Sequence, residues 1–487
     1  MNRPIRYLAI ACLVMFVALL INVNYVQFVE ADSLNAKNGN KRVINEEFSR
    51  DRGAILVGGE PIAESVASKD EYSYQRTYNE PELYAPLTGY FSYIYGRSAL
   101  ENSQNRVLSG SDNRLFVNRV VDLLANKQPK GGSVELTIDP LAQKTAKDGL
   151  EALGDDTKGS VVALDPETGE ILAMVTQPSY DPNDLASHDF GAVQKSWNTL
   201  NADKNQPMLN RATQQILPPG STFKLVTAAA ALENGLEPDD GVKGGTRLTF
   251  PGMSYALVNE NGASCGDKLT FERALNISCN VSFGSIADDL GQEKLAEQAA
   301  KFGFGTDPLD GIAADASRFA TADSELSVDK LAQSGIGQFE VAATPLQMAM
   351  VAAGIANDGD VMKPYLVRTV RSPNLRVLEQ TQPERLSQAM SPANASKLRQ
   401  MMVSTVQSGT ATSARIPGVE VGGKTGTAQS TPDRPPYAWF VSYGEKDGKQ
   451  VAVAVVVESS DTSRDEIAGG RLAGPIARSV MEAVLGS

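Results

Sequence analysis

Residues 156–487 are predicted to fold as an α+β domain in which an antiparallel sheet packs on a helical cluster. Two apolar runs, at residues 160–164 and 171–175, flank the turn at 165–169, a pattern typical of a β-hairpin. A second apolar hairpin lies near the end of the sequence, and alanine-rich helical segments fill the space between the two. Because one predicted hairpin precedes the helices in the sequence and the other follows them, strands from both ends of the domain should pair in one sheet.

The second hairpin has its strands at residues 439–443 and 451–457, around the turn Asp447-Gly448. The helices between the hairpins, and the terminal helix, are expected from their apolar periodicity and alanine content. They are predicted at residues 269–290, 345–356, 393–406 and 472–485.

The sequence before this domain divides into three parts. Arg3 and Arg6 precede an almost wholly apolar run at residues 8–23, which predicts either a cleaved signal peptide or a retained membrane anchor. We favour an anchor over residues 1–28, because no convincing small-residue cleavage site follows, with the arginines inside and the bulk exported. A polar linker is expected at 29–48 and a supporting or partner-binding pedestal domain at 49–155, with one helix near 113–124.

Charge and histidine content exclude several function classes. A formal net charge of -13 argues against nucleic-acid partners. The single histidine, His188, lies in a polar loop and is expected to be a surface residue. A Ser-His-Asp triad would need this one imidazole, and a zinc site usually needs several His or Cys ligands, so neither a triad, a metal site nor a cofactor is expected.

The strongest local signal is Pro218-Pro219-Gly220-Ser221-Thr222-Phe223-Lys224. Two prolines and a glycine cannot carry a helix from upstream, whereas the alanine-rich run that follows is a strong helix former, so a helix should begin at Ser221 and end at Asn234-Gly235. Residues three apart share one helical face, so Lys224 should reach the Ser221 hydroxyl. This is the geometry of an activated nucleophile.

A second Ser-x-x-Lys pattern, Ser327 to Lys330, lacks this context. Ser327 sits in an acidic stretch with no glycine turn before it and no long apolar run after it. We interpret it as a solvated helix start.

A strand is predicted to enter Gly422-Gly423-Lys424-Thr425-Gly426-Thr427. The glycine pair fits a strand whose backbone is closely approached by another group. Lys424 and the hydroxyls of Thr425 and Thr427 offer a cation and two donors, which suit a carboxylate ligand.

Between these two stretches lies Ser278-Cys279-Asn280. The Ser-x-Asn pattern is common in this sequence, and order selects among its copies. The others begin at Ser33, Ser103, Ser111, Ser196 and Ser372. Only Ser278 and Ser372 fall between Ser221 and Lys424, and Pro373 marks the later one as a loop. Cys265 and Cys279 are disulfide candidates if the domain is exported, with two buried thiols as the alternative.

Taken in order, Ser-x-x-Lys, Ser-x-Asn and Lys-Thr-Gly resemble the motif set of penicillin-binding proteins and serine β-lactamases. Further stretches are similar to the monofunctional, class B penicillin-binding proteins, and within that family to the actinobacterial penicillin-binding protein A type. These stretches are residues 136–139, 163–174, 177–183, 335–338 and 344–347. Arg52-Gly53 and residues 96–101 resemble the N-terminal pedestal domain of that family.

The resemblance implies the transpeptidase fold of this family and a D,D-transpeptidase that cross-links peptidoglycan stem peptides ending in D-alanyl-D-alanine and is inhibited covalently by β-lactams. Ser221 would be the nucleophile, Lys224 its base, Ser278 the proton relay and Asn280 the residue that holds Lys224. The roles implied for the remaining residues are an oxyanion hole of backbone N–H groups and a carboxylate site. The first comprises Ser221 and Thr427, and the second Lys424, Thr425, Gly426 and Thr427.

The implied location is the cell membrane, with one anchor and the catalytic domain on the extracytoplasmic side. A membrane glycan polymerase and division or elongation proteins are the implied partners. Two alternatives stay open: a D,D-carboxypeptidase or endopeptidase, in which water deacylates Ser221, and a non-catalytic scaffold.

Overall fold

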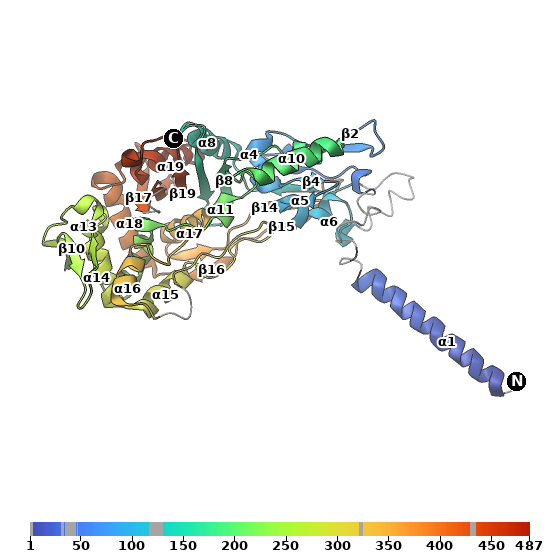
Figure 1. The fold of residues 1–487 in the computed structure, drawn as a ribbon, viewed down its shortest axis with the longest axis horizontal. Coiled ribbons are helices and arrows are strands. Elements are labelled where there is room, and N and C mark those ends of the chain that lie inside the picture. The colour runs from blue at the N-terminus through green and yellow to red at the C-terminus, as the bar shows by residue number, and fades with distance from the viewer. Residues whose placement is uncertain are drawn as a thin grey trace.

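The structure is a computed structural model that describes residues 3–30, 34, 45, 47–115, 130–320, 325–428 and 435–487. Its first element, α1 (Arg3–Asn24), continues as a π-helical turn, η1 (Tyr25–Val29), and stands away from the rest of the molecule (Figure 1). In the described part of the chain, Arg3–Gln27 is the one span long and apolar enough to cross a membrane, and none of it is buried. Its composition and position fit a membrane anchor or a signal sequence.

Two predictions fall largely outside the described residues. Most of the linker predicted at 29–48 is among them. The helix predicted near 113–124 is described only as far as the 3₁₀ turn η2 (Asn113–Leu115).

A six-stranded sheet in the order β15-β14-β6-β1-β2-β3 organises the pedestal. Its strands are β1 (Ile55–Val57), β2 (Glu60–Ala67), β3 (Tyr74–Tyr78), β6 (Ser133–Leu136), β14 (Val367–Arg371) and β15 (Val377–Gln380). β1 and β6 pair in parallel, and the other pairs are antiparallel. Because β14 and β15 come from much later in the sequence, the sheet is built from two separate stretches of the chain.

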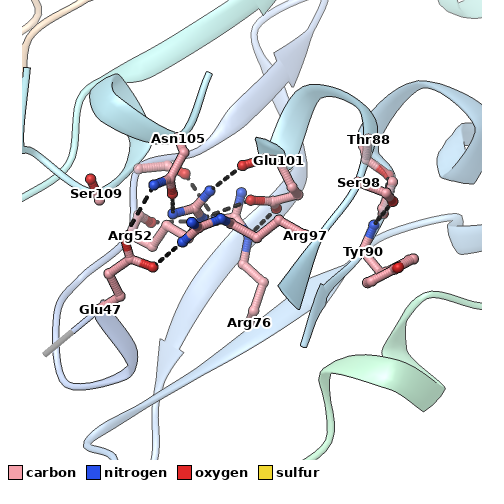
Figure 2. Close-up of polar contacts among 12 residues, drawn as sticks. Glu47, Arg52, Arg76, Thr88, Tyr90, Arg97, Ser98, Glu101, Asn105 and Ser109 are labelled. Atoms are coloured by element: carbon pink, nitrogen blue, oxygen red, sulfur yellow. Dashed lines mark hydrogen bonds and ion pairs between the residues drawn. The ribbon is translucent and has the colours of Figure 1, made fainter. Parts of the chain in front are cut away.

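A buried ion cluster links α5 (Ala99–Ser103), one of the short elements that cover this sheet, to β3 and to the segment before β1. Glu101 is fully buried and accepts hydrogen bonds from Arg52 Nε at 2.6 Å and Arg76 Nε at 2.7 Å (Figure 2). Burial raises the pKa of Glu101, but the charges of Arg76 and Arg52 outweigh it and hold that pKa below its ordinary value. The covering elements are α4 (Pro81–Thr88), β4 (Phe91–Ser92), β5 (Gly96–Arg97), α5 (Ala99–Ser103) and α6 (Asn105–Leu108).

The second sheet is five-stranded and antiparallel, in the order β17-β18-β19-β7-β8. Its strands are β7 (Lys158–Leu164), β8 (Ile171–Gln177), β17 (Glu420–Ala428), β18 (Tyr437–Lys446) and β19 (Lys449–Ser459). β19 pairs with β7, with Ala454 opposite Val162. The two predicted hairpins and their joining into one sheet are therefore confirmed.

Both faces of this sheet are buried. Val161 and Ala163 face the layer formed by α8 (Pro140–Glu151) and α19 (Gly469–Leu485), whereas Val162 and Leu164 belong to the core around α17 (Pro345–Ala356). The alternation follows from the two-residue period of a strand. Buried Val and Ala side chains on both faces explain why the strands read as continuous apolar runs.

A helical cluster packs on the α17 side of the sheet (Figure 1). Its members are α12 (Lys224–Glu233), α13 (Phe271–Asn276), α14 (Asn280–Leu290), α15 (Gln292–Lys301), α16 (Val328–Gly335) and α18 (Pro392–Ser408). Short two-stranded sheets pair β9 (Gly241–Lys243) with β12 (Lys268–Thr270), β10 (Arg247–Thr249) with β11 (Ala256–Val258), and β13 (Asp360–Met362) with β16 (Arg385–Gln388). Further helices are α9 (Asn183–Ala186), α10 (Phe190–Ala202) and α11 (Arg211–Gln214), with the 3₁₀ turns η4 (Glu260–Gly262), η5 (Thr412–Ala414) and η6 (Arg464–Glu466).

Two predicted helices differ from the structure. The helix predicted at 269–290 is broken into α13 and α14, because Ser278 adopts a left-handed backbone with φ 61°. The helix predicted from Ser221 begins as a 3₁₀ turn, η3 (Gly220–Phe223), and becomes α-helical at Lys224. Its end at Asn234 is confirmed.

Ser327 is the residue just before α16 and is exposed, with its hydroxyl donating to Asp329 Oδ1 at 2.6 Å, which confirms the predicted helix start. His188 is in the loop between α9 and α10, but the prediction of a surface side chain is wrong. Its ring is hydrogen-bonded to Asp70 and packed on Tyr72, so only 10% of the side chain is exposed.

Candidate active site

The turn that carries Ser221 is fixed from both sides. Trp439 Nε1, on β18, donates to Pro218 O at 3.0 Å, and the Gly220 N–H donates to Gly337 O at 2.9 Å. Gly337 has φ 75° and leaves no room for a side chain, because a Cβ there would lie 2.1 Å from Gly220 O. These contacts hold Ser221, half-buried, one turn before the first residue of α12.

Lys224 is fully buried and joins the turn to the Ser278 loop. Its Nζ donates to Ser278 O at 2.7 Å, to Ser278 Oγ at 3.2 Å and to Asn280 Oδ1 at 2.7 Å. Burial, and then the nearby charge of Lys424, lower the pKa of Lys224 well below its ordinary value, against a smaller raising effect of Glu260. Among the described residues, the Ser221 hydroxyl has no hydrogen-bond partner, so the predicted contact with Lys224 stays a prediction.

Ser278 lies between two lysines. Lys424 Nζ, on β17, donates to Ser278 Oγ at 2.9 Å and to Thr425 O at 2.9 Å. Lys424 is also fully buried, and burial lowers its pKa to about 7 despite the opposing charge of Glu260. A hydroxyl held between two amines of depressed pKa can pass protons in either direction.

The left-handed backbone of Ser278 is supported by its neighbours. Cys279 is joined to Cys265 by a disulfide. Asn259 Oδ1 accepts from the Val281 N–H at 3.1 Å, and Asn276 Nδ2 donates to Ser404 O at 3.0 Å on α18. The loop between α13 and α14 is therefore anchored to both flanking segments.

β17 lies at the edge of the sheet, against the Ser221 turn. A Cβ at Gly426 would lie 2.9 Å from Pro219 O, so the strand approaches the turn closely. Thr425 and Thr427 are half-buried beside it. Thr425 Oγ1 lies 2.8 Å from Thr410 Oγ1.

The structure thus brings Lys224, Ser278, Asn280 and Lys424 together by hydrogen bonds, while Ser372 lies apart, in the turn after β14. Sequence reasoning missed Glu260 and Thr410. Neither belongs to a recognisable pattern, and only the folding of distant segments places them here. Within the described residues, no three His, Cys, Asp or Glu side chains cluster as a metal site would require.

The comparisons with known proteins match this arrangement. A family model of the penicillin-binding protein transpeptidase domain matches residues 159–482. The chain belongs to the penicillin-binding protein transpeptidases. A second model, the penicillin-binding protein A dimerisation domain, matches residues 52–134, which include three complete strands of the pedestal sheet, β1, β2 and β3, and the start of β6.

Full-length relatives place the chain within this family. It is 41% identical over 491 residues to the peptidoglycan D,D-transpeptidase PbpA of Mycolicibacterium smegmatis, covering 100% of this chain and 99% of that protein. It is 39% identical over 493 residues to PbpA of Mycobacterium tuberculosis, covering 100% and 99%. The predicted family and the predicted transpeptidase activity are both confirmed.

Solved structures give the same result. Penicillin-binding protein A of Mycobacterium tuberculosis, as its ceftriaxone acyl-enzyme complex, aligns with a TM-score of 0.86 at 38% identity, covering 91% of this chain and 100% of that chain. Its imipenem acyl-enzyme complex aligns with a TM-score of 0.85, covering 90% and 100%. The predicted fold of this penicillin-binding protein is therefore confirmed.

Proposed function

We propose that this penicillin-binding protein cross-links peptidoglycan stem peptides as a D,D-transpeptidase, through an acyl-enzyme on Ser221, and that β-lactams acylate the same serine. The observation that carries the proposal is the buried Lys224 amine, hydrogen-bonded to Ser278 and Asn280 and depressed in pKa. A neutral amine in this position has two hydrogens and one lone pair. The hydrogens serve Ser278 O and Asn280 Oδ1, so the neutral amine can no longer donate to Ser278 Oγ, and its lone pair is available to accept the Ser221 proton.

Acylation proceeds through two proton transfers. Ser221 Oγ attacks the carbonyl carbon of the penultimate D-alanine while its proton passes to Lys224, which becomes an ammonium. As the peptide C–N bond breaks, Ser278 gives its hydroxyl proton to the leaving nitrogen and takes one from Lys224. The terminal D-alanine departs, and Lys224 is neutral again.

Two further sets of groups hold the substrate. The backbone N–H groups of Ser221 and Thr427 form the oxyanion hole, where each such donor contributes about 3 kcal/mol in acyl-transfer enzymes. Lys424, Thr425 and Thr427 hold the terminal carboxylate, and Gly426 lets the strand approach the turn. The half-burial of Thr425 and Thr427 supports this assignment, since a carboxylate site must be open to ligand.

Deacylation returns Ser221 to its free form. The amine of a second stem peptide attacks the acyl-enzyme carbonyl, a new peptide bond forms, and the amine proton leaves through the same groups. The D,D-transpeptidase relatives support an amine acceptor over water.

The first helix supports a location at the membrane. We propose that α1 is retained as a single membrane anchor, with Arg3 and Arg6 on the cytoplasmic side and the catalytic domain outside. The disulfide between Cys265 and Cys279 supports an oxidising, extracytoplasmic location. The partners would be a membrane glycan polymerase and division or elongation proteins, and no nucleic acid.

The test is to supply the purified full chain with uncross-linked peptidoglycan strands and to separate the products by mass. Cross-linked stem peptides and one released D-alanine per cross-link support transpeptidation. Release of D-alanine without cross-links would favour the carboxypeptidase. A matched Ser221→Ala variant should give neither product.

A further inference from the structure

Thr410 lies outside all three motifs but touches one of them. It is in the short segment between α18 and η5, and its Oγ1 lies 2.8 Å from Thr425 Oγ1. Thr410 is exposed and Thr425 half-buried, so the hydroxyl pair is open to a ligand. In such a contact one hydroxyl hydrogen lies between the two oxygens, and the hydrogen of the accepting hydroxyl must point away from its partner.

Thr410 is held in place through its backbone. Its N–H donates to Asn276 O at 3.2 Å, two residues before Ser278. The preceding Gly409 leaves no space, because a Cβ there would lie 2.4 Å from the same carbonyl oxygen. The position of Thr410 is therefore set by the loop that carries Ser278.

Thr425 packs against the start of α19. A Cβ on Gly470, at the start of α19, would lie 3.2 Å from Thr425 Cγ2 and 3.0 Å from Thr410 O. The methyl group of Thr425 thus faces Gly470 while its hydroxyl faces Thr410. This packing selects one side-chain conformation of Thr425.

We propose that Thr410 is a positioning residue for the carboxylate of the substrate, acting through Thr425. When Thr410 donates its hydroxyl hydrogen to Thr425 Oγ1, the Thr425 hydrogen is left to donate to the carboxylate. The hydrogen bond from Thr410 to Thr425 and the one from Thr425 to the carboxylate then form a chain of donors, in which each bond strengthens the other. This inference rests on the proposed function, in which Thr425 binds that carboxylate.

The test compares two probes on the full chain, penicillin G and its methyl ester, which lacks the anionic carboxylate. The measured quantity is the second-order acylation rate constant for penicillin G divided by that for its methyl ester. Thr410→Val, which keeps the shape and removes the hydroxyl, should lower the ratio about three- to tenfold. Thr410→Ser should restore it, and the double variant with Thr425→Val should be no worse than Thr425→Val alone. Thr199→Val, the same change on exposed α10, is the matched control and should leave the ratio unchanged.

The outcomes separate the two proposals. If Thr425→Val lowers the ratio and Thr410→Val does not, the role of Thr410 is wrong and the carboxylate site stands. If Thr410→Val slows acid and ester equally, Thr410 is merely structural and the inference is overturned. If Thr425→Val leaves the ratio unchanged, the carboxylate role assigned to Thr425 fails, and the inference fails with it. Where Thr410→Val does not fold, Thr410→Ala provides the same comparison.

Discussion

Lys224 and Lys424 direct their amines at the same hydroxyl, that of Ser278, from 3.2 and 2.9 Å. Both amines are fully buried, and the charge of Lys424 adds to burial in lowering the pKa of Lys224. Without a substrate carboxylate beside Lys424, the two lysines therefore cannot both carry a proton without a large cost. We infer that one serves as base while the other keeps its charge for the substrate.

If Lys224 is the base and Lys424 stays charged, the rate constant of β-lactam acylation should depend on pH as a bell-shaped curve. The rate constant should fall at low pH as Lys224 takes up a proton, and fall again above about pH 7, where Lys424 loses its charge. In Lys424→Arg the alkaline decline should move to higher pH, because a guanidinium stays charged. Stopped-flow acylation between pH 5 and 10 in a constant-ionic-strength buffer measures this, and an alkaline decline unmoved in Lys424→Arg would refute the assignment.

The Ser221 turn should depend on the smallness of Gly337. In Gly337→Ala, the new methyl group would meet Gly220 O at 2.1 Å and Phe223 Cβ at 2.7 Å, so the turn must shift and acylation should drop by at least about 100-fold. Gly235→Ala is the matched control, since Gly235 also has a positive φ, 92°, but nothing within 4 Å. That control should lose about 1 kcal/mol of stability and keep its acylation rate. Equal acylation in the two variants would contradict the account.

The disulfide should hold the Ser278 loop. Cys265 and Cys279 close a loop with a sequence separation of 14, a cross-link that contributes about 3 kcal/mol. Reduction should lower the β-lactam acylation rate several-fold, because Ser278 and Asn280 then lose part of their support. The double variant Cys265→Ser, Cys279→Ser should acylate slowly with or without reductant. If thiol titration shows full reduction while the rate is unchanged, the bridge does not position the loop.

Glu101 should matter for stability and little for chemistry. Glu101→Ala leaves Arg52 and Arg76 buried without their carboxylate, which costs about 3–5 kcal/mol. Because the pKa of Glu101 is lowered in the folded chain, its contribution is present above the unfolded-state pKa and is lost as pH falls through the folded-state pKa. Thermal unfolding at pH 7 and at pH 4 measures both effects. Asp148→Ala, which breaks the exposed pair with Lys144, should leave the midpoint nearly unchanged.

Local patterns were enough to predict part of this structure. The Ser221 turn, the two hairpins, α17 and the strand β17 each follow from proline and glycine positions and from apolar periodicity within one short segment. The order of the three motifs then selected Ser278, which the structure joins to Lys224 and Lys424.

The rest depended on contacts between distant segments. The break at Ser278 interrupts a sequence that reads as one helix, and it is supported by Asn259 and by the disulfide. β14 pairs with β6 although Val370 and Val134 are far apart in sequence. The sequence therefore did not predict that β14 and β15 belong to the pedestal sheet. Thr410 meets Thr425 only because α18 and β17 pack together.

Every step of the proposed reaction depends on Ser221 as the nucleophile. The most direct measurement is intact-protein mass spectrometry of the full chain after exposure to penicillin G, with peptide mapping of the adduct. We predict one adduct, on Ser221, that is absent from Ser221→Ala and retained in Ser327→Ala. An adduct on any other residue, or no adduct on a folded chain, would contradict it.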